Sequence, residues 1–121
     1  MNKKPPMSNI YLEKLDLYEK LVETISGLER KGATMPYTSL NGHMFSFLNK
    51  EGVLGLRLPG GVREQFLEKY ATNLCEEYGT ILKEYVSVPE DLLKKTQELK
   101  QYFLISFDYV KSLKPKNPSK K

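Results

Sequence analysis

Two side chains of this sequence have the chemistry of a catalytic pair: His43, the only histidine, and Cys75, the only cysteine. A cysteine becomes a nucleophile when a neighbouring base takes its proton, but the spacing gives no sign that these residues meet. A lone cysteine is more often a small buried hydrophobic residue. Glu76 and Glu77 are adjacent in the sequence and point in different directions, which suits a general acid–base pair poorly. We therefore expect no enzymatic activity, no metal and no cofactor.

The segment Arg57–Arg63 is a candidate anion site. It reads RLPGGVR, and glycines ahead of a helix can expose backbone N–H groups to a bound anion. The segment lacks the GxxxxGK[ST] pattern of a phosphate-binding loop, and a turn from strand to helix uses glycine for its geometry alone. A structural role is therefore the favoured interpretation.

Arg57 and Glu84 are charged residues inside predicted strands that are otherwise built of Leu or Val. A buried charge without a partner costs several kcal/mol, so each of them needs a reason to be there. We expect at least one of the two to be partly buried and hydrogen-bonded, and to orient the strand at 82–88 or a neighbouring helix. The sequence does not reveal the strand order, so it does not say whether the two pair with each other.

The elements that position these residues are clearest between 37 and 59, where a three-stranded antiparallel meander is predicted. Asn41-Gly42 is typical of a type I′ hairpin turn, because both residues tolerate positive φ. Asn49–Gly52 reads as a second turn of four residues. We expect Leu40 to pair with His43 across the first turn and Leu48 with Val53 across the second. This register predicts a core face made of Leu40, Phe45, Phe47, Leu54, Leu56 and Leu58.

The opposite, outer face of the meander is the candidate interaction surface. The predicted register places a mixed set of side chains on it: Tyr37, Ser39, Met44, Ser46, Leu48, Val53, Gly55 and Arg57. We take Tyr37, Ser39, Met44, Ser46 and Arg57 as the candidate interaction residues. The alternative is a partly solvated face on which Arg57 lies over Met44, as long cationic side chains often do.

Helices flank the meander. Apolar residues recur with helical spacing from about 10 to 28, from about 62 to 71 and from Thr96 up to Pro115, and a short strand is predicted at 82–88. A turn or short helix should follow Pro89. The sequence thus predicts an α+β fold, in which an N-terminal helix and C-terminal helices pack on an antiparallel sheet of three meander strands and one later strand. The chain has room for one domain, which we place at 9–113.

The positive charge is concentrated at the two ends. The net charge is +4, but seven of the 19 Lys and Arg residues lie near the termini, so residues 5–110 hold 12 basic and all 15 acidic residues and carry −3. The body therefore lacks the basic stripe of a dedicated DNA-binding domain. We expect a flexible segment at 1–8 and a disordered basic tail at 114–121, KPKNPSKK. Weak contact of these lysines with nucleic acid is the alternative to a purely solubilising role.

The cellular location is inferred from the sequence signals for membrane insertion and secretion. The sequence contains neither a run of about 18 apolar residues for a membrane span nor the apolar core of a secretory signal. A single cysteine agrees with a reducing environment. We expect a cytoplasmic protein that does not contact membranes.

The order of several motifs resembles the TfoX N-terminal domain family over about 31–116. The motifs are Gly42-His43-Met44-Phe45, Gly52, Leu56-Arg57-Leu58-Pro59, Lys83-Glu84-Tyr85-Val86-Ser87-Val88-Pro89 and Ser112-Leu113-Lys114-Pro115-Lys116. The resemblance implies a small α+β fold similar to the YjbR double-wing proteins, in a family named for bacterial regulators of competence genes. It gives no catalytic residues, and it makes Glu84 and Tyr85 candidate structural polar residues.

Two functions are therefore expected from different classes. The first is a non-enzymatic regulatory or protein-interaction domain that binds an unknown protein partner or a second copy of itself. The alternative is a nucleic-acid-binding accessory protein in transcription or competence regulation.

Overall fold

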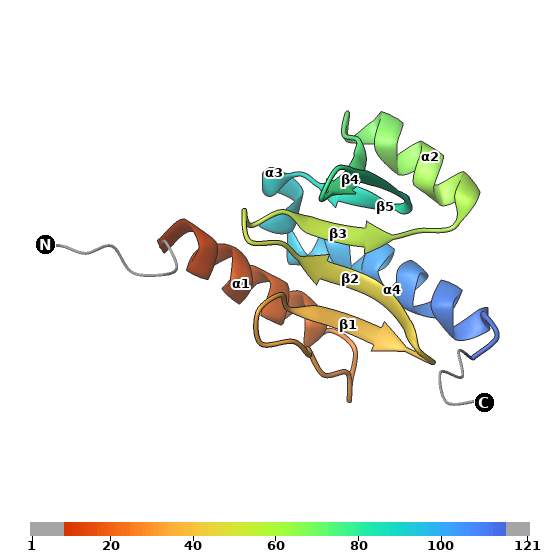
Figure 1. Ribbon diagram of the computed structural model, residues 1–121, viewed down its shortest axis with the longest axis horizontal. Coiled ribbons are helices and arrows are strands. Elements are labelled where there is room, and N and C mark those ends of the chain that lie inside the picture. Colours follow the sequence, from red (N-terminus) through yellow and green to blue (C-terminus); the bar gives the residue numbers. More distant parts are fainter. Residues whose placement is uncertain (1–8, 116–121) are drawn as a thin grey trace, which may run out of the picture.

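A computed structural model describes residues 9–115, which form a five-stranded antiparallel sheet with helices against one face (Figure 1). The predicted α+β class is confirmed. The elements are α1 (Asn9–Val22), β1 (Tyr37–Leu40), β2 (His43–Leu48), β3 (Leu54–Arg57), α2 (Gly60–Lys69), β4 (Leu74–Glu77), β5 (Thr80–Val88), α3 (Glu90–Leu93) and α4 (Thr96–Ser112). The segment expected to be flexible, 1–8, and residues 116–121 of the expected tail lie outside the described residues.

The strand order is β1-β2-β3-β5-β4, so β5 returns beside the meander and β4 occupies an edge. The sequence prediction missed β4. Its residues, LCEE, lack an apolar alternation, and they form a strand because they pair with β5 across the two-residue turn Tyr78-Gly79. Both turn residues have positive φ, 53° and 78°, as a type I′ turn requires.

The main core lies between the sheet and the helices. Phe45 packs against two rings of α4, with ring centroids 5.5 Å from Phe103 and 5.8 Å from Phe107. The hydroxyl groups of Tyr18 in α1 and Ser46 in β2 are hydrogen-bonded at 2.7 Å. At the far side of the core, Phe66 of α2 meets Tyr102 of α4 edge to face. We call the face of the sheet that carries these contacts the helix face, and the opposite one the outer face.

The first predicted turn is confirmed and the second differs by one residue. Leu40 pairs with His43, as expected. Leu48, however, pairs with Leu54 and not with Val53. The reason is the turn itself: Asn49 and Val53 close a three-residue loop, with Gly52 at a φ of 84°. The side-chain oxygen of Asn49 also accepts the N–H groups of Glu51 and Val53, which fixes this shorter loop.

A shift of one residue exchanges the two faces of a strand, so part of the face prediction is wrong. Ser46 and Leu48, predicted on the outer face, are fully buried on the helix face. Phe47, predicted in the core, lies on the outer face opposite Gly55. A β-bulge in the pairing of β1 with β2 leaves Phe45 on the helix face beside Ser46, so Phe45 and Leu56 share a face as predicted.

Candidate functional site

The outer face carries three of the five candidate interaction residues in the predicted way. Thr38 is buried on the helix face, so its neighbours Tyr37 and Ser39 face outward, and Met44 pairs with Ser39. All three are half-buried. Ser46 is excluded from this surface because its hydroxyl lies inside the core against Tyr18.

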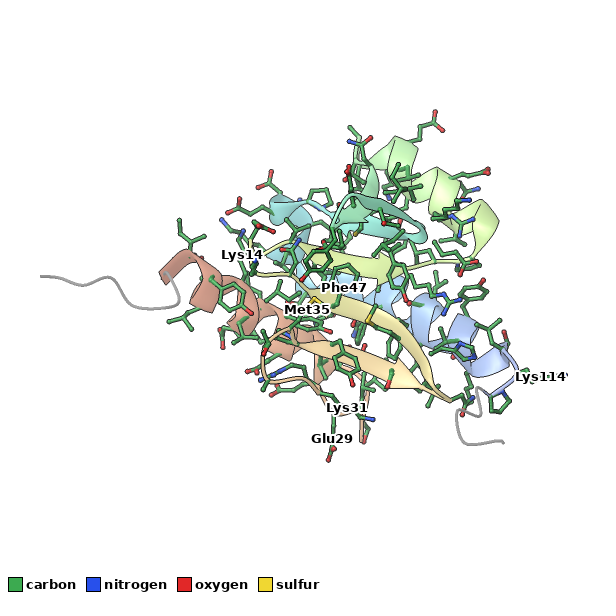
Figure 2. The ribbon with its side chains drawn as sticks, viewed as in Figure 1. Lys14, Glu29, Lys31, Met35, Phe47 and Lys114 are labelled. Atoms are coloured by element: carbon green, nitrogen blue, oxygen red, sulfur yellow. The ribbon has the colours of Figure 1, made fainter. Side chains whose placement is uncertain are left out.

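Phe47 is the centre of a small apolar cluster on the outer face. Its ring lies directly over Gly55, where any Cβ atom would collide with the ring. The ring centroid of Tyr85 is 5.6 Å from that of Phe47. Cys75 of β4 completes the cluster, because its sulfur would lie 3.0 Å from a Cβ atom at Gly55. Figure 2 labels Phe47 of β2 and, near it in this view, Met35 of the segment that leads into β1.

These contacts require the β4–β5 hairpin to curl over the outer face. Gly55 lies on β3, two strands away from β4 in the sheet order, so a short cysteine side chain reaches it only if β4 leaves the plane of the sheet. The pairing of β4 with β5 is interrupted at the corresponding point. Leu74 pairs with Val86 but Cys75 pairs with Leu82, which leaves residues 83–85 of β5 without partners on β4.

The tip of the hairpin is tied to the turn between β2 and β3. The side-chain amide of Asn49 donates a 2.9 Å hydrogen bond to the carboxylate of Glu77. A groove of about 430 Å³ lies between hairpin and turn, and its lining includes Met35, Glu51 and Tyr78.

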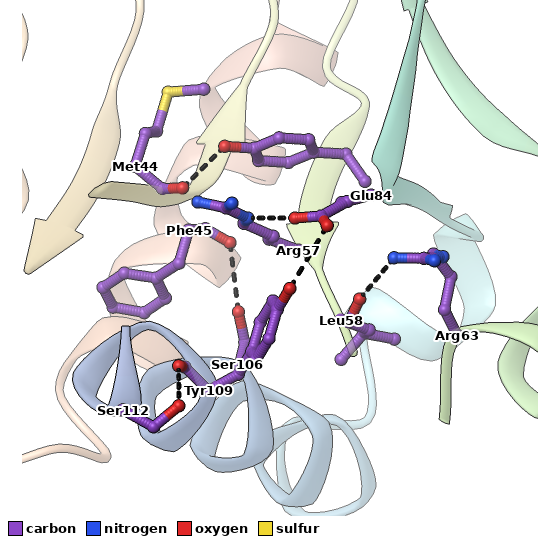
Figure 3. A network of polar contacts seen from close by, with 10 residues as sticks. Met44, Phe45, Arg57, Leu58, Arg63, Glu84, Ser106, Tyr109 and Ser112 are labelled. Atoms are coloured by element: carbon purple, nitrogen blue, oxygen red, sulfur yellow. Dashed lines mark hydrogen bonds and ion pairs between the residues drawn. The ribbon is translucent and has the colours of Figure 1, made fainter. Parts of the chain in front are cut away.

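Arg57 and Glu84 form an ion pair at the other end of β3 (Figure 3). Arg57 Nε donates to Glu84 Oε1 at 2.7 Å, and the hydroxyl group of Tyr109 in α4 donates to Glu84 Oε2 at 3.2 Å. The side chains of Arg57 and Glu84 are 19% and 36% exposed. Both are therefore partly buried and hydrogen-bonded, as the sequence led us to expect, and here they bond to each other.

Two tyrosine rings enclose the guanidinium group. Arg57 Cζ lies 6.0 Å from the ring centroid of Tyr85 and 5.6 Å from that of Tyr109. The Tyr85 hydroxyl donates a 2.6 Å hydrogen bond to the carbonyl of Met44. The cluster of these residues, which we call the Arg57 clamp, joins β2, β3, β5 and α4. Because the arginine is turned toward Glu84, it adds little to the open outer surface.

The electrostatics of the Arg57 clamp favour its ionised form. Burial opposes ionisation of Glu84, but the hydrogen bond and charge of Arg57, helped by Tyr109 and Arg63, hold the pKa of that carboxyl below its usual value. Burial raises the pKa of Tyr85 and of Tyr109, so both phenols stay protonated donors at neutral pH. The clamp is thus a charged pair with neutral donors around it, which suits positioning better than proton transfer.

The candidate anion segment is engaged within the protein. Arg63 Nη1 donates to the carbonyl of Leu58 at 2.9 Å, and the backbone N–H of Arg63 donates to the carbonyl of Pro59 at the start of α2. Arg57 is held by Glu84. These contacts agree with the structural interpretation of the segment.

His43 and Cys75 have separate environments. His43 Nε2 is 2.8 Å from the carbonyl oxygen of Lys114, after the end of α4. Cys75 is buried, and burial raises the pKa of its thiol to about 11, which leaves little thiolate at neutral pH. Among residues 9–115, no group of three or more His, Cys, Asp or Glu side chains has the geometry of a metal site. In the same part of the chain, no helix is both long and apolar enough to cross a membrane.

Sequence reasoning missed several residues of this region. The register prediction places Phe47 in the core, whereas it lies on the outer face. Cys75 is buried, as a lone cysteine usually is, but the sequence did not place it over Gly55. Tyr109 is not singled out within its predicted helix. Asn49 was recognised as a turn residue, but its bond to Glu77 spans 28 positions and depends on the curl of the hairpin. One local signal was present: Tyr78-Gly79 lies between LCEE and TILKEYV, and a Gly at the second position of a two-residue turn favours a hairpin.

Comparison of the chain with protein-family models, with curated proteins and with solved structures gives no match. The similarity to the TfoX N-terminal domain therefore rests on the motifs of the sequence alone.

Proposed function

We propose that this protein is a non-enzymatic protein-interaction domain of the TfoX N-terminal type, with a regulatory role, and that it binds its partner through the outer face of the sheet. The partner is another protein or a second copy of this chain. The proposal includes a cytoplasmic location, with which the single, buried cysteine agrees.

The observation that carries the proposal is the composition of the helix-free face. Helices α1, α3 and α4 and the core residue of α2 lie on the helix face, so within residues 9–115 no helix covers the outer face. An antiparallel sheet that merely faces water normally presents polar residues there. This face instead presents half-buried Tyr37, Met44 and Tyr85 beside Ser39 and Ser87.

The edges of the sheet are less suited to binding than the face. At β1, the backbone of Tyr37 exchanges two hydrogen bonds with Lys31, at 2.8 and 2.9 Å, which occupies that end of the edge. At β4, the edge carries exposed Glu76. Both features disfavour the addition of a further strand. The same features leave the outer face as the available surface.

A matched pair of variants tests the proposal. Met44→Glu places a charge on the outer face, and Leu104→Glu places the same charge on an exposed site of α4, where Leu104 is 50% exposed. Partners should be trapped by a photo-crosslinker at position 44, identified, and purified for titration, and self-association should be followed by sedimentation. We expect Met44→Glu to weaken binding at least about tenfold, since it buries an unpaired charge in the interface, and Leu104→Glu to leave it unchanged.

Two outcomes would contradict this proposal. In the first, the purified partner binds Met44→Glu as tightly as it binds the wild type. In the second, the protein stays monomeric at all concentrations and the crosslinker at position 44 traps nothing.

A further inference from the structure

The outer part of the β4–β5 hairpin, residues 75–82, has few contacts with the rest of the molecule. In residues 9–115, β4 pairs with no strand except β5. Within residues 9–115, the Asn49 amide donates to Glu77 at the tip, and the Ser87 hydroxyl donates a 3.5 Å hydrogen bond to the Cys75 sulfur. Segments with few such contacts open at a lower free energy than the core does.

The hairpin also has a point about which it can bend. Residues 83–85 of β5 face no partner on β4, because the register changes between Leu74 and Cys75. From Glu84 onward β5 is held firmly: the Leu58 N–H donates to the Glu84 carbonyl at 2.9 Å, and residues 85–88 pair with β3. The bend therefore falls at Lys83. An interrupted ladder beside a well-paired one is the usual geometry of a bent strand.

The hairpin covers apolar surface on the outer face, which carries no helix within residues 9–115. Phe47 is 1% exposed and Cys75 is 2% exposed, although both lie on the face without helices. The tip beyond them is open to solvent, since Tyr78 is 94% exposed and Ile81 is 56% exposed. The hairpin thus buries an aromatic ring beneath it while its own tip is held by few contacts.

We propose that residues 75–82 form a flap that opens by bending at Lys83 and uncovers Phe47 next to the outer-face residues Tyr37 and Met44. Opening breaks the Asn49–Glu77 bond and the bond from Ser87 to the Cys75 sulfur, and it lifts Cys75 away from Gly55. The pairing of β3 with β5 at 85–88 stays intact. The flap thereby regulates how much apolar surface the outer face presents. This regulatory role rests on the proposed function, whereas the opening itself does not.

Cys75 reports opening directly, because it is the only cysteine of the chain and faces the surface that the flap covers. The rate of its reaction with a thiol reagent should be measured on the full chain under native conditions and at rising denaturant concentration. We expect reaction through local opening, with a rate that depends on denaturant much less steeply than global unfolding does.

Three variants distinguish loss of the hydrogen bond between Asn49 and Glu77 from loss of the negative charge of Glu77. Glu77→Ala removes the acceptor of the Asn49 bond, Glu77→Gln keeps an acceptor without the charge, and Glu76→Ala removes an exposed charge next door. We expect Glu77→Ala to speed the labelling about tenfold, the effect of losing one hydrogen bond to a carboxylate. Glu77→Gln and Glu76→Ala should stay within about twofold of the wild type, at an unchanged melting temperature.

Two results would overturn the flap. One is labelling of Cys75 that follows global unfolding in its denaturant dependence. The other is an equal labelling rate in Glu77→Ala and Glu76→Ala. Neither result depends on binding, so a failed flap is distinguishable from a failed interaction surface, for which Met44→Glu is the test.

Discussion

Removal of the Glu84 carboxylate should destabilise the fold through the Arg57 clamp. Glu84→Ala leaves the guanidinium of Arg57, which is 19% exposed and enclosed by two tyrosine rings, without its acceptor. It also removes the acceptor of the Tyr109 hydroxyl. A hydrogen bond between charged groups contributes about 1.5–3 kcal/mol when buried, and an exposed pair contributes about 0–1 kcal/mol. For this partly exposed pair we expect a loss of about 2 kcal/mol in the free energy of unfolding.

The assay is denaturant and thermal unfolding of the full chain. For a domain of this size a loss of about 2 kcal/mol corresponds to a fall of about 6–10 °C in the melting temperature. Lys83→Ala is the matched control, because it changes an exposed neighbour in the same strand and should stay within about 0.5 kcal/mol of the wild type. A double-mutant cycle of Arg57→Met and Glu84→Gln should give a coupling energy of about 1 kcal/mol. Equal stability of Glu84→Ala and Lys83→Ala would refute the structural role of the pair.

The ion pair of Arg57 and Glu84 should make the stability of the fold depend on pH. The pKa of Glu84 is lower in the folded protein than in the unfolded chain, where a Glu has a pKa of about 4.3. The contribution of Glu84 to the free energy of unfolding is therefore fully present above that value and is lost as the pH falls through the folded pKa. The difference in stability between wild type and Glu84→Gln should shrink when unfolding is measured below about pH 4. A constant difference over the acidic range would show that ionisation of Glu84 does not stabilise the fold.

Three further predictions follow from the backbone and the tail. Gly55→Ala should destabilise the fold by about 1–3 kcal/mol in a denaturant titration, because its Cβ collides with the ring of Phe47, and an unchanged midpoint would contradict the placement of that ring. Gly42→Val should lower the melting temperature, since a β-branched residue at a φ of 81° is strained, and an unchanged melting curve would count against the turn. Deletion of Lys114–Lys121 should abolish any retention on DNA at low salt, and tight binding by the truncated chain at physiological salt would overturn that assignment.

The sequence predicted correctly those parts of the fold that depend on residues close together in the chain. Asn41-Gly42 specifies its turn by backbone conformation alone, so the pairing of Leu40 with His43 was predictable. The next turn was not, because loops of three and four residues share the same composition and the choice depends on the side chain of Asn49. That single residue moved Ser46 and Phe47 to opposite faces from those predicted.

The candidate site was harder to predict because its contacts join distant strands. Arg57 and Glu84 were singled out as charges that needed partners, but their pairing requires that β5 lie beside β3, which no local pattern encodes. The burial of Cys75 over Gly55 requires both the missed strand β4 and its curl over the sheet. The sequence did predict the outer-face positions of Tyr37, Ser39 and Met44, because side chains alternate between the two faces of a strand there.

The most direct test of the interaction surface uses the methionine methyl groups, because the chain has only four methionines: Met1, Met7, Met35 and Met44. Methyl signals should be recorded by NMR while the purified partner, or the protein itself, is titrated into the labelled chain. If the outer face is the binding surface, the Met44 signal shifts or broadens saturably with the binding isotherm. Saturable binding that leaves the Met44 and Met35 signals unchanged would contradict the account.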